Sequence, residues 1–101
     1  MYKSPQTFHA GKLYKFIRKN PEKNFFKTDY INFIQDDNST GKVIGVPVDS
    51  VLVFVKKSMH LFYEHVHFLL PEGVIAKIGT IHLKDITVRY DLYLEEVKDN
   101  V

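Results

Sequence analysis

The stretch SMHLFYEHVHFLLPEGV, residues 58–74, decides the fold, because its first part can be interpreted as a helix or as a strand. Several of its large apolar residues have helical spacing, and Ser58 could cap such a helix. Two further apolar residues fall outside that spacing, however. The sequence 70–74 also places proline and glycine where a tight hairpin turn needs them. The sequence therefore favours a β-hairpin with arms 62–70 and 74–83.

The segment after this turn continues the β pattern towards the C-terminus. Ala76 and Ile78 share one parity whereas Ile81 and Leu83 share the other, so we expect a β-bulge at Gly79. From residue 86 to residue 95, apolar and other residues alternate with a period of two. This alternation predicts a last strand.

The segment before residue 58 also predicts strands, at 12–18, 29–35, 42–48 and 51–55. In the first of them, Tyr14 and Phe16 point to one face. Asn20-Pro21 predicts that residues 19–27 form a long loop, and residues 36–41 have turn composition. Gly45 and Pro47 indicate that 42–48 is an edge strand.

These elements predict one all-β domain, with room for one short helix, built as a small β-barrel or sandwich of six to seven strands. A barrel is preferred, because several strands are apolar on both parities. The fragments Leu13-Tyr14-Lys15-Phe16 and 45–51 resemble the opening strand and closing segment of SH3 domains, over less than a fifth of the chain. The acidic loop and tryptophan pair of those domains are missing, so the resemblance implies an SH3-like barrel but no ligand. We place the domain at 11–97, between a flexible N-terminal tail at 1–10 and a C-terminal tail at 98–101.

Composition limits the classes of function. The chain has 101 residues, 45% of them apolar, and no cysteine, which excludes disulfides and Cys-ligated metals. No apolar run is long enough to span a bilayer, so we expect a cytoplasmic protein without membrane association. Its abundance of Lys, Ile, Asn, Phe and Tyr is typical of AT-rich genomes, including those of bacteriophages and mobile elements.

Motifs for catalysis are missing from the sequence. None of the four serines lies in Gly-x-Ser-x-Gly, and the five glycines form no phosphate-binding loop. His65 and His67 would share a face of a strand, and His60 or His82 could join them in a zinc site. Core or surface histidines explain the same pattern more simply. We therefore predict no enzyme, no metal and no cofactor, with a His-metal enzyme as the third hypothesis.

Basic residues gather near the N-terminus, where residues 1–30 carry a net charge of +5 against −3 for the remainder. Aromatic residues interleave with them, as in barrels that bind single strands. The candidate residues for binding a partner or a nucleic acid are Lys12, Tyr14, Lys15, Phe16, Arg18, Lys19, Lys23, Phe25, Phe26 and Lys27.

The sequence predicts a non-enzymatic interaction module that binds a protein partner, such as a small accessory protein of a phage or mobile element. This prediction is based on the missing catalytic motifs and on the high aromatic content, since interfaces are rich in Tyr and Phe. The alternative is a small barrel that binds nucleic acid through its basic segment. A homo-oligomer formed through the edge strand 42–48 is a further possibility.

Overall fold

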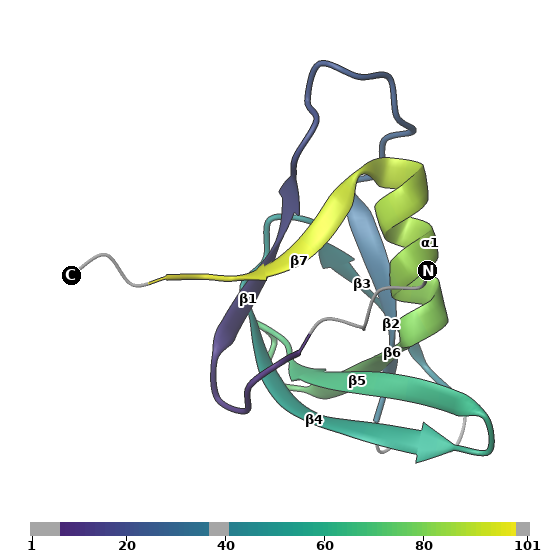
Figure 1. The fold of residues 1–101 in the computed structure, drawn as a ribbon. Helices are drawn as coiled ribbons and strands as arrows, with labels where there is room; N and C mark the ends of the chain where they lie inside the picture. Colours follow the sequence, from purple (N-terminus) through teal and green to yellow (C-terminus); the bar gives the residue numbers. More distant parts are fainter. Residues whose placement is uncertain (1–6, 37–40, 99–101) are drawn as a thin grey trace.

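The computed structural model describes residues 7–36 and 41–98 and shows one sheet and one helix in this part of the chain (Figure 1). In chain order the elements are β1 (Leu13–Arg18), β2 (Tyr30–Gln35), β3 (Val43–Pro47), β4 (Leu52–His60), β5 (Tyr63–Leu69), β6 (Ile75–Gly79), α1 (Thr80–Tyr90) and β7 (Leu92–Glu96). The predicted fold class, all-β with a short helix, is confirmed. The SH3 resemblance stays a prediction.

The strands form one antiparallel sheet in the order β3-β2-β6-β5-β4-β1-β7. The sheet curls into a half-barrel, and α1 packs on its core side against β5, β6 and β7 (Figure 1). Strand β3 lies at one end of the order, as Gly45 and Pro47 predict for an edge strand. The long loop between β1 and β2 is also confirmed.

The core on the concave side of the sheet is aromatic. Phe68 of β5 lies at its centre, with its ring centroid 5.6 Å from that of Phe54 and 6.2 Å from those of Tyr14 and Phe33. Phe8 stacks on Phe54 at 5.3 Å. The predicted N-terminal tail therefore includes a residue that packs against the core. Such edge-to-face and stacked pairs stabilise a core beyond the area they bury.

The β5–β6 hairpin confirms the strand interpretation of residues 62–70. Its turn is closed by hydrogen bonds from the Leu70 amide to the Val74 carbonyl and from the Gly73 amide to the Leu70 carbonyl, each 2.9 Å. Gly73 has φ +89°, a conformation that glycine adopts readily. The helical spacing fails here because alternate residues of β5, including Val66 and Phe68, are buried in the core of the half-barrel.

The prediction for residues 79–91 is wrong, because this segment is helical. Gly79 has an extended backbone and is the N-cap of α1, where we expected a bulge within an arm reaching Leu83. The expected strand 86–95 is only β7, residues 92–96. The buried side of α1 is built by residues at helical spacing, Leu83, Ile86 and Tyr90, which pack against the core. Tertiary packing therefore overrides the strand-like alternation.

Most of the predicted turn 36–41, namely residues 37–40, lies outside the described residues, as does most of the predicted C-terminal tail. In the part that the structure describes, no helix has the length and apolar character needed to cross a membrane.

Candidate functional site

The structure divides the ten predicted binding residues between the core and the surface. Tyr14 and Phe16 are 1% and 6% exposed and belong to the core. The Tyr14 hydroxyl accepts a hydrogen bond from the His9 amide at 2.8 Å. Both rings therefore pack in the core rather than on the surface, which counts against their assignment to a binding surface. The strand alternation placed both on one face, and that face is the inner one.

The remaining predicted residues follow β1 and the loop after it. Phe25 is half-buried and Phe26 is 74% exposed. Lys15 is half-buried, and the exposed cations are Lys12, Arg18, Lys19, Lys23 and Lys27.

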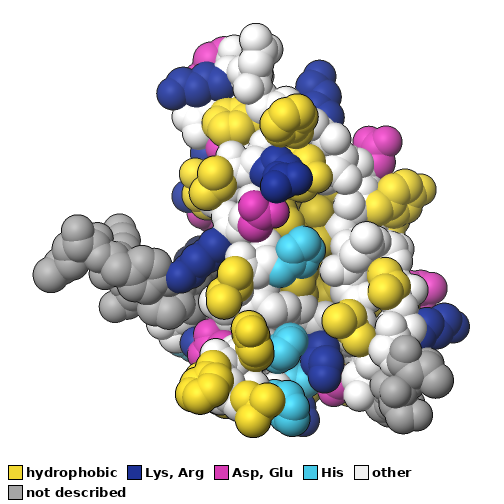
Figure 2. Space-filling model, turned by 90° about the vertical axis from the view of Figure 1, so that its right-hand side faces the viewer, with side chains coloured by type: hydrophobic (Ala, Val, Ile, Leu, Met, Phe, Trp, Pro, Cys, Tyr) yellow, Lys and Arg dark blue, Asp and Glu magenta, His cyan; other side chains and the backbone are white. Residues whose placement is uncertain are grey.

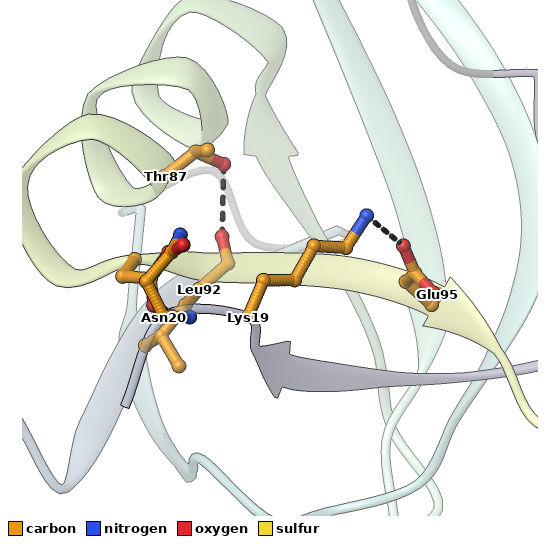
Figure 3. A network of polar contacts seen from close by, with 6 residues as sticks. Lys19, Asn20, Thr87, Leu92 and Glu95 are labelled. Atoms are coloured by element: carbon orange, nitrogen blue, oxygen red, sulfur yellow. Dashed lines mark hydrogen bonds and ion pairs between the residues drawn. The ribbon is translucent and has the colours of Figure 1, made fainter. Parts of the chain in front are cut away.

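Acidic residues of β7 lie directly beside this basic strand. Lys15 pairs in register with Glu95, and the Lys19 ammonium lies 2.6 Å from the Glu95 carboxylate (Figure 3). The hydrogen bond to Glu95 raises the pKa of Lys19, against a smaller opposing effect of burial. Lys19 Nζ also lies 4.5 Å from the centroid of the Tyr93 ring. The basic segment is therefore partly neutralised in three dimensions, although it is strongly positive in sequence.

Asp91 is a buried carboxylate at the end of α1. It accepts hydrogen bonds from the Asn20 backbone amide at 2.6 Å and from the Asn20 side chain at 2.9 Å. Burial by itself would raise the pKa of Asp91, but the hydrogen bonds from Asn20 and from the Lys19 backbone outweigh it and hold this pKa below its usual value. Thr87 donates to the Leu92 carbonyl at 2.8 Å in the same region (Figure 3). These contacts connect α1, β7 and the loop after β1.

The tip of the β4–β5 hairpin, residues Met59–Tyr63, exposes four large apolar side chains. The exposed fractions are 65% for Met59, 75% for Leu61, 93% for Phe62 and 59% for Tyr63. We call the five residues Met59–Tyr63 the hairpin tip. Figure 2 shows hydrophobic side chains gathered at the lower end of one face, with histidine side chains beside them.

The backbone of the hairpin tip is also unusual. Leu61 has φ +56°, in the left-handed region that Asn and Gly normally occupy in two-residue hairpin turns. The sequence therefore uses Leu at a position where Asn or Gly would adopt the backbone conformation more easily and would be more soluble. The sequence-based interpretation missed this site because it began a strand arm at Phe62 and predicted no β-turn at Leu61-Phe62.

Three polar side chains form a hydrogen-bonded chain on the face of the sheet opposite the core. His67 Nδ1 lies 2.5 Å from Asp36 Oδ1, and His67 Nε2 lies 2.6 Å from Ser58 Oγ. We call this set the Asp36–His67–Ser58 relay. The search for local serine motifs could not find it, because its members come from β4, β5 and the residue after β2. Their arrangement follows from the β4–β5 register, which places residues 58 and 65 opposite each other and which the sequence alone does not give.

His65 lies beside this relay, opposite Ser58. Burial lowers the pKa of His65, and the charges of Lys77, His67 and His60 lower it further. Among the residues that the structure describes, no three His, Asp or Glu side chains gather in a way that could hold a metal ion.

A cavity of about 180 Å³ lies between α1 and the core side of the sheet. Its charged lining residues are Lys57, Glu64 and Lys84, and Glu64 accepts a hydrogen bond from Thr80 at 2.8 Å. Charges of both signs therefore line this apolar cavity, and they single out no class of ligand.

Comparison with protein-family models, with curated proteins and with solved structures finds no significant match to this chain. Function must therefore be argued from the arrangement of these residues.

Proposed function

We propose that the protein is an interaction module that binds a protein partner through the hairpin tip. The observation that carries this proposal is Phe62, whose side chain is 93% exposed at the end of a hairpin. Isolated exposed apolar residues are common, but adjacent large ones typically mark interaction sites. Here Met59, Leu61 and Tyr63 surround Phe62 in the sequence and are exposed as well.

The backbone at Leu61 supports the same proposal. A left-handed conformation costs a bulky residue roughly 1–2 kcal/mol, and no packing of the exposed Leu61 side chain compensates for it within the domain. A Leu-Phe turn thus works against both folding and solubility. Unfavourable local choices of this kind concentrate at functional sites.

The chemistry of the hairpin tip favours a protein partner over a nucleic acid. His60 is the only titratable side chain in it besides the Tyr63 phenol, and a strongly apolar surface with little charge suits a complementary apolar groove. The nucleic-acid alternative has less support, because Tyr14 and Phe16 are buried and Glu95 pairs with Lys19.

The decisive variant is the double substitution Leu61→Asn, Phe62→Gly. Asn tolerates the positive φ of residue 61 better than Leu does, and Gly adopts any turn conformation at residue 62, so this variant should keep the hairpin. Loss of two central apolar residues should weaken partner binding by about 2 kcal/mol or more, roughly thirtyfold in Kd. The matched control is Val88→Ser, since Val88 is 75% exposed on α1, outside the hairpin.

The partner is identified by a photo-crosslinking amino acid placed at position 62, followed by mass spectrometry in extract of the native host. Calorimetric titration of the purified partner then compares the natural chain with both variants. Equal affinity of the Asn-Gly variant would overturn the proposal, and recovery that nuclease treatment abolishes would support the nucleic-acid alternative. The cytoplasmic location, a phage or mobile-element origin and self-association through β3 stay predictions.

A further inference from the structure

We propose that the Asp36–His67–Ser58 relay makes Ser58 a nucleophile and that the protein cleaves small esters that carry an apolar group. This inference departs from the sequence-based expectation of a non-enzymatic protein. It does not rest on the proposed partner binding, because it depends on different side chains. A nucleophile bonded to a base that is oriented by a third group is the geometric signature of covalent catalysis.

The hydrogen bonds assign each group its direction. An ionised carboxylate only accepts, so His67 Nδ1–H donates to Asp36 at 2.5 Å. In the neutral imidazole, the other nitrogen, Nε2, then carries a lone pair and accepts a hydrogen bond from the Ser58 hydroxyl at 2.6 Å. This tautomer is the one that a general base for serine requires.

The fold holds the three groups in place. Ser58 and His67 lie on neighbouring strands whose register pairs Ser58 with His65 and Lys56 with His67, so both side chains lie on the same face. The Asp36 backbone amide donates to the Ile75 carbonyl at 2.9 Å and anchors the residue beside β6. His67 is 5% exposed, whereas Ser58 is half-buried. The base is therefore fixed while the hydroxyl remains partly open to substrate.

The charged and titratable neighbours suit a developing oxyanion. Lys56 and Lys77 are the register partners of His67 on its two sides, which places two cations on this face. His65 lies opposite Ser58 and carries a lowered pKa, so it is neutral at pH 7. Lys56 is the cation on the same strand as Ser58, whereas Lys77 lies on β6, beyond His67. A cation beside a reacting carbonyl stabilises negative charge on its oxygen, so Lys56 is the one suited to this role.

The substrate class follows from the next residues along the hairpin. His60 and Tyr63 form the adjacent pair on the same face as Ser58 and His65, roughly 7 Å farther along the strands at about 3.4 Å per residue. Tyr63 is 59% exposed and offers an aromatic surface to an apolar group of the ester. A small ester with an aromatic alcohol or a short acyl chain fits this arrangement.

The reaction has two balanced halves. Ser58 Oγ bonds to the ester carbonyl carbon while its proton moves to His67 Nε2, and the alcohol then leaves with that proton as the original C–O bond breaks. Water next attacks the acyl carbon and gives its proton to His67, which returns it to Ser58 Oγ as the carboxylic acid is released. Asp36 faces the imidazolium in both halves and stabilises its charge.

The test uses the full chain, a fluorophosphonate probe and p-nitrophenyl butyrate. We expect the probe to add covalently to Ser58, as shown by peptide mass spectrometry, and Ser58→Ala to lower kcat/KM at least tenfold. Asp36→Asn should lower the rate and shift its pH profile, because the imidazole tautomer is then no longer fixed. The control is Ser50→Ala, since Ser50 is also half-buried but precedes β4.

Two results would overturn the proposal. One is a natural chain that remains unlabelled at Ser58, and this measurement needs no variant to fold. The other is a folded Ser58→Ala protein that hydrolyses the ester as fast as the natural chain, which would assign the turnover to surface lysines or histidines. The Asn-Gly hairpin variant should keep the labelling of Ser58 even where it loses partner binding, so failure of one proposal is distinguishable from failure of the other.

Discussion

Asp91 and His67 are both buried polar side chains, but they have different kinds of partners. Asp91 accepts hydrogen bonds from amides of Asn20 and Lys19, and amides neither take nor release a proton in the physiological range. His67 lies between the carboxylate of Asp36 and the hydroxyl of Ser58. A proton can move along the second set and cannot move along the first. Burial of a polar residue thus indicates chemistry only when its partners can exchange protons.

The two clusters also differ in what they connect. Asp91 bonds to a residue 71 positions away in sequence and fixes the junction of α1 and β7 to the loop after β1. The Asp36–His67–Ser58 relay connects β4, β5 and the residue after β2, which the β4–β5, β5–β6 and β2–β6 pairings already hold together. The first cluster therefore contributes more to the tertiary structure than the second does.

The largest expected effect is from Asp91→Ala. This variant removes the acceptor for two Asn20 donors and puts alanine at φ +57°, where Asp and Asn are better tolerated. The midpoint temperature of unfolding, measured by circular dichroism, should fall by roughly 10 °C or more. The midpoint temperature of Asp91→Asn should fall less, because asparagine also tolerates a positive φ and keeps one acceptor oxygen.

The matched control for Asp91 is Asp85→Ala on the exposed side of α1. Asp85 and Arg89 form an ion pair of 3.6 Å with both side chains about half exposed. Such pairs contribute little, so Tm should change by less than about 3 °C. Equal losses for Asp85→Ala and Asp91→Ala would contradict the structural importance of the buried carboxylate.

The second largest effect is expected from His67→Leu. Leucine fills the buried site but leaves Asp36 and Ser58 without their imidazole partner. The Asp36 side chain is 22% exposed and Ser58 is half-buried, so water replaces part of what is lost. The free energy of unfolding in urea should fall by about 1–2 kcal/mol, with the m-value unchanged. No loss at all would show that the hydrogen bonds of His67 contribute nothing to stability.

The parts of the fold that depend on local sequence could be predicted, and the parts that depend on distant packing partners could not. The turn at Pro71-Glu72-Gly73 is local chemistry, so it identified the β5–β6 hairpin against the helical spacing of residues 58–70. In α1, the β-branched residues Ile81, Ile86 and Val88 favour a strand. The apolar alternation also continues from α1 into β7, so the sequence predicted a strand where the structure has a helix. Leu83, Ile86 and Tyr90 had helical spacing in the same segment. The packing partner that selects between the two periods lies elsewhere in the chain.

The candidate sites show the same limit. The basic segment was visible as a run of charge, but its neutralisation by Glu95 depends on pairing β1 with β7, residues far apart in sequence. The Asp36–His67–Ser58 relay depends on strand register and on β2 lying beside β6, which no spacing of serine and histidine encodes. Neither arrangement could be recovered before the topology was known.

A smaller effect, on the pH dependence of stability, is expected from His65, which lies beside the relay. Burial and the neighbouring Lys77, His67 and His60 charges lower the pKa of His65, whereas Asp36 opposes this shift. Below the unfolded value of about 6.5 the unfolded chain binds a proton that the folded chain resists, so stability falls as pH falls towards the lowered pKa. The pKa of Asp91 is also lowered, and its contribution is lost only at more acidic pH, below about 4.

Urea midpoints at pH 7.5 and pH 5.5 measure the His65 effect. The natural chain should lose stability over this interval, and His65→Gln should lose less, because glutamine does not titrate. Asp91→Asn should leave the difference between the two pH values unchanged. A pH dependence that His65→Gln does not reduce would show that the other histidines dominate it.

The smallest effect is expected at Lys19, next to Asn20 in the chain. Its ammonium lies 2.6 Å from the Glu95 carboxylate, but the two side chains are 48% and 41% exposed, so solvent and salt screen their attraction. The raised pKa of Lys19 means that the stabilising contribution is present at neutral pH and is lost only as pH rises through that pKa. Lys19→Gln should therefore change Tm by less than about 2 °C at pH 7, and by still less in 1 M salt.

Asn20→Ala should lower Tm clearly more, because it removes the side-chain donor to the buried Asp91. If Lys19→Gln destabilised the protein as much as Asn20→Ala, the loop after β1 would be held by the surface ion pair, and the contrast between buried amide partners and exposed charges would fail at this junction.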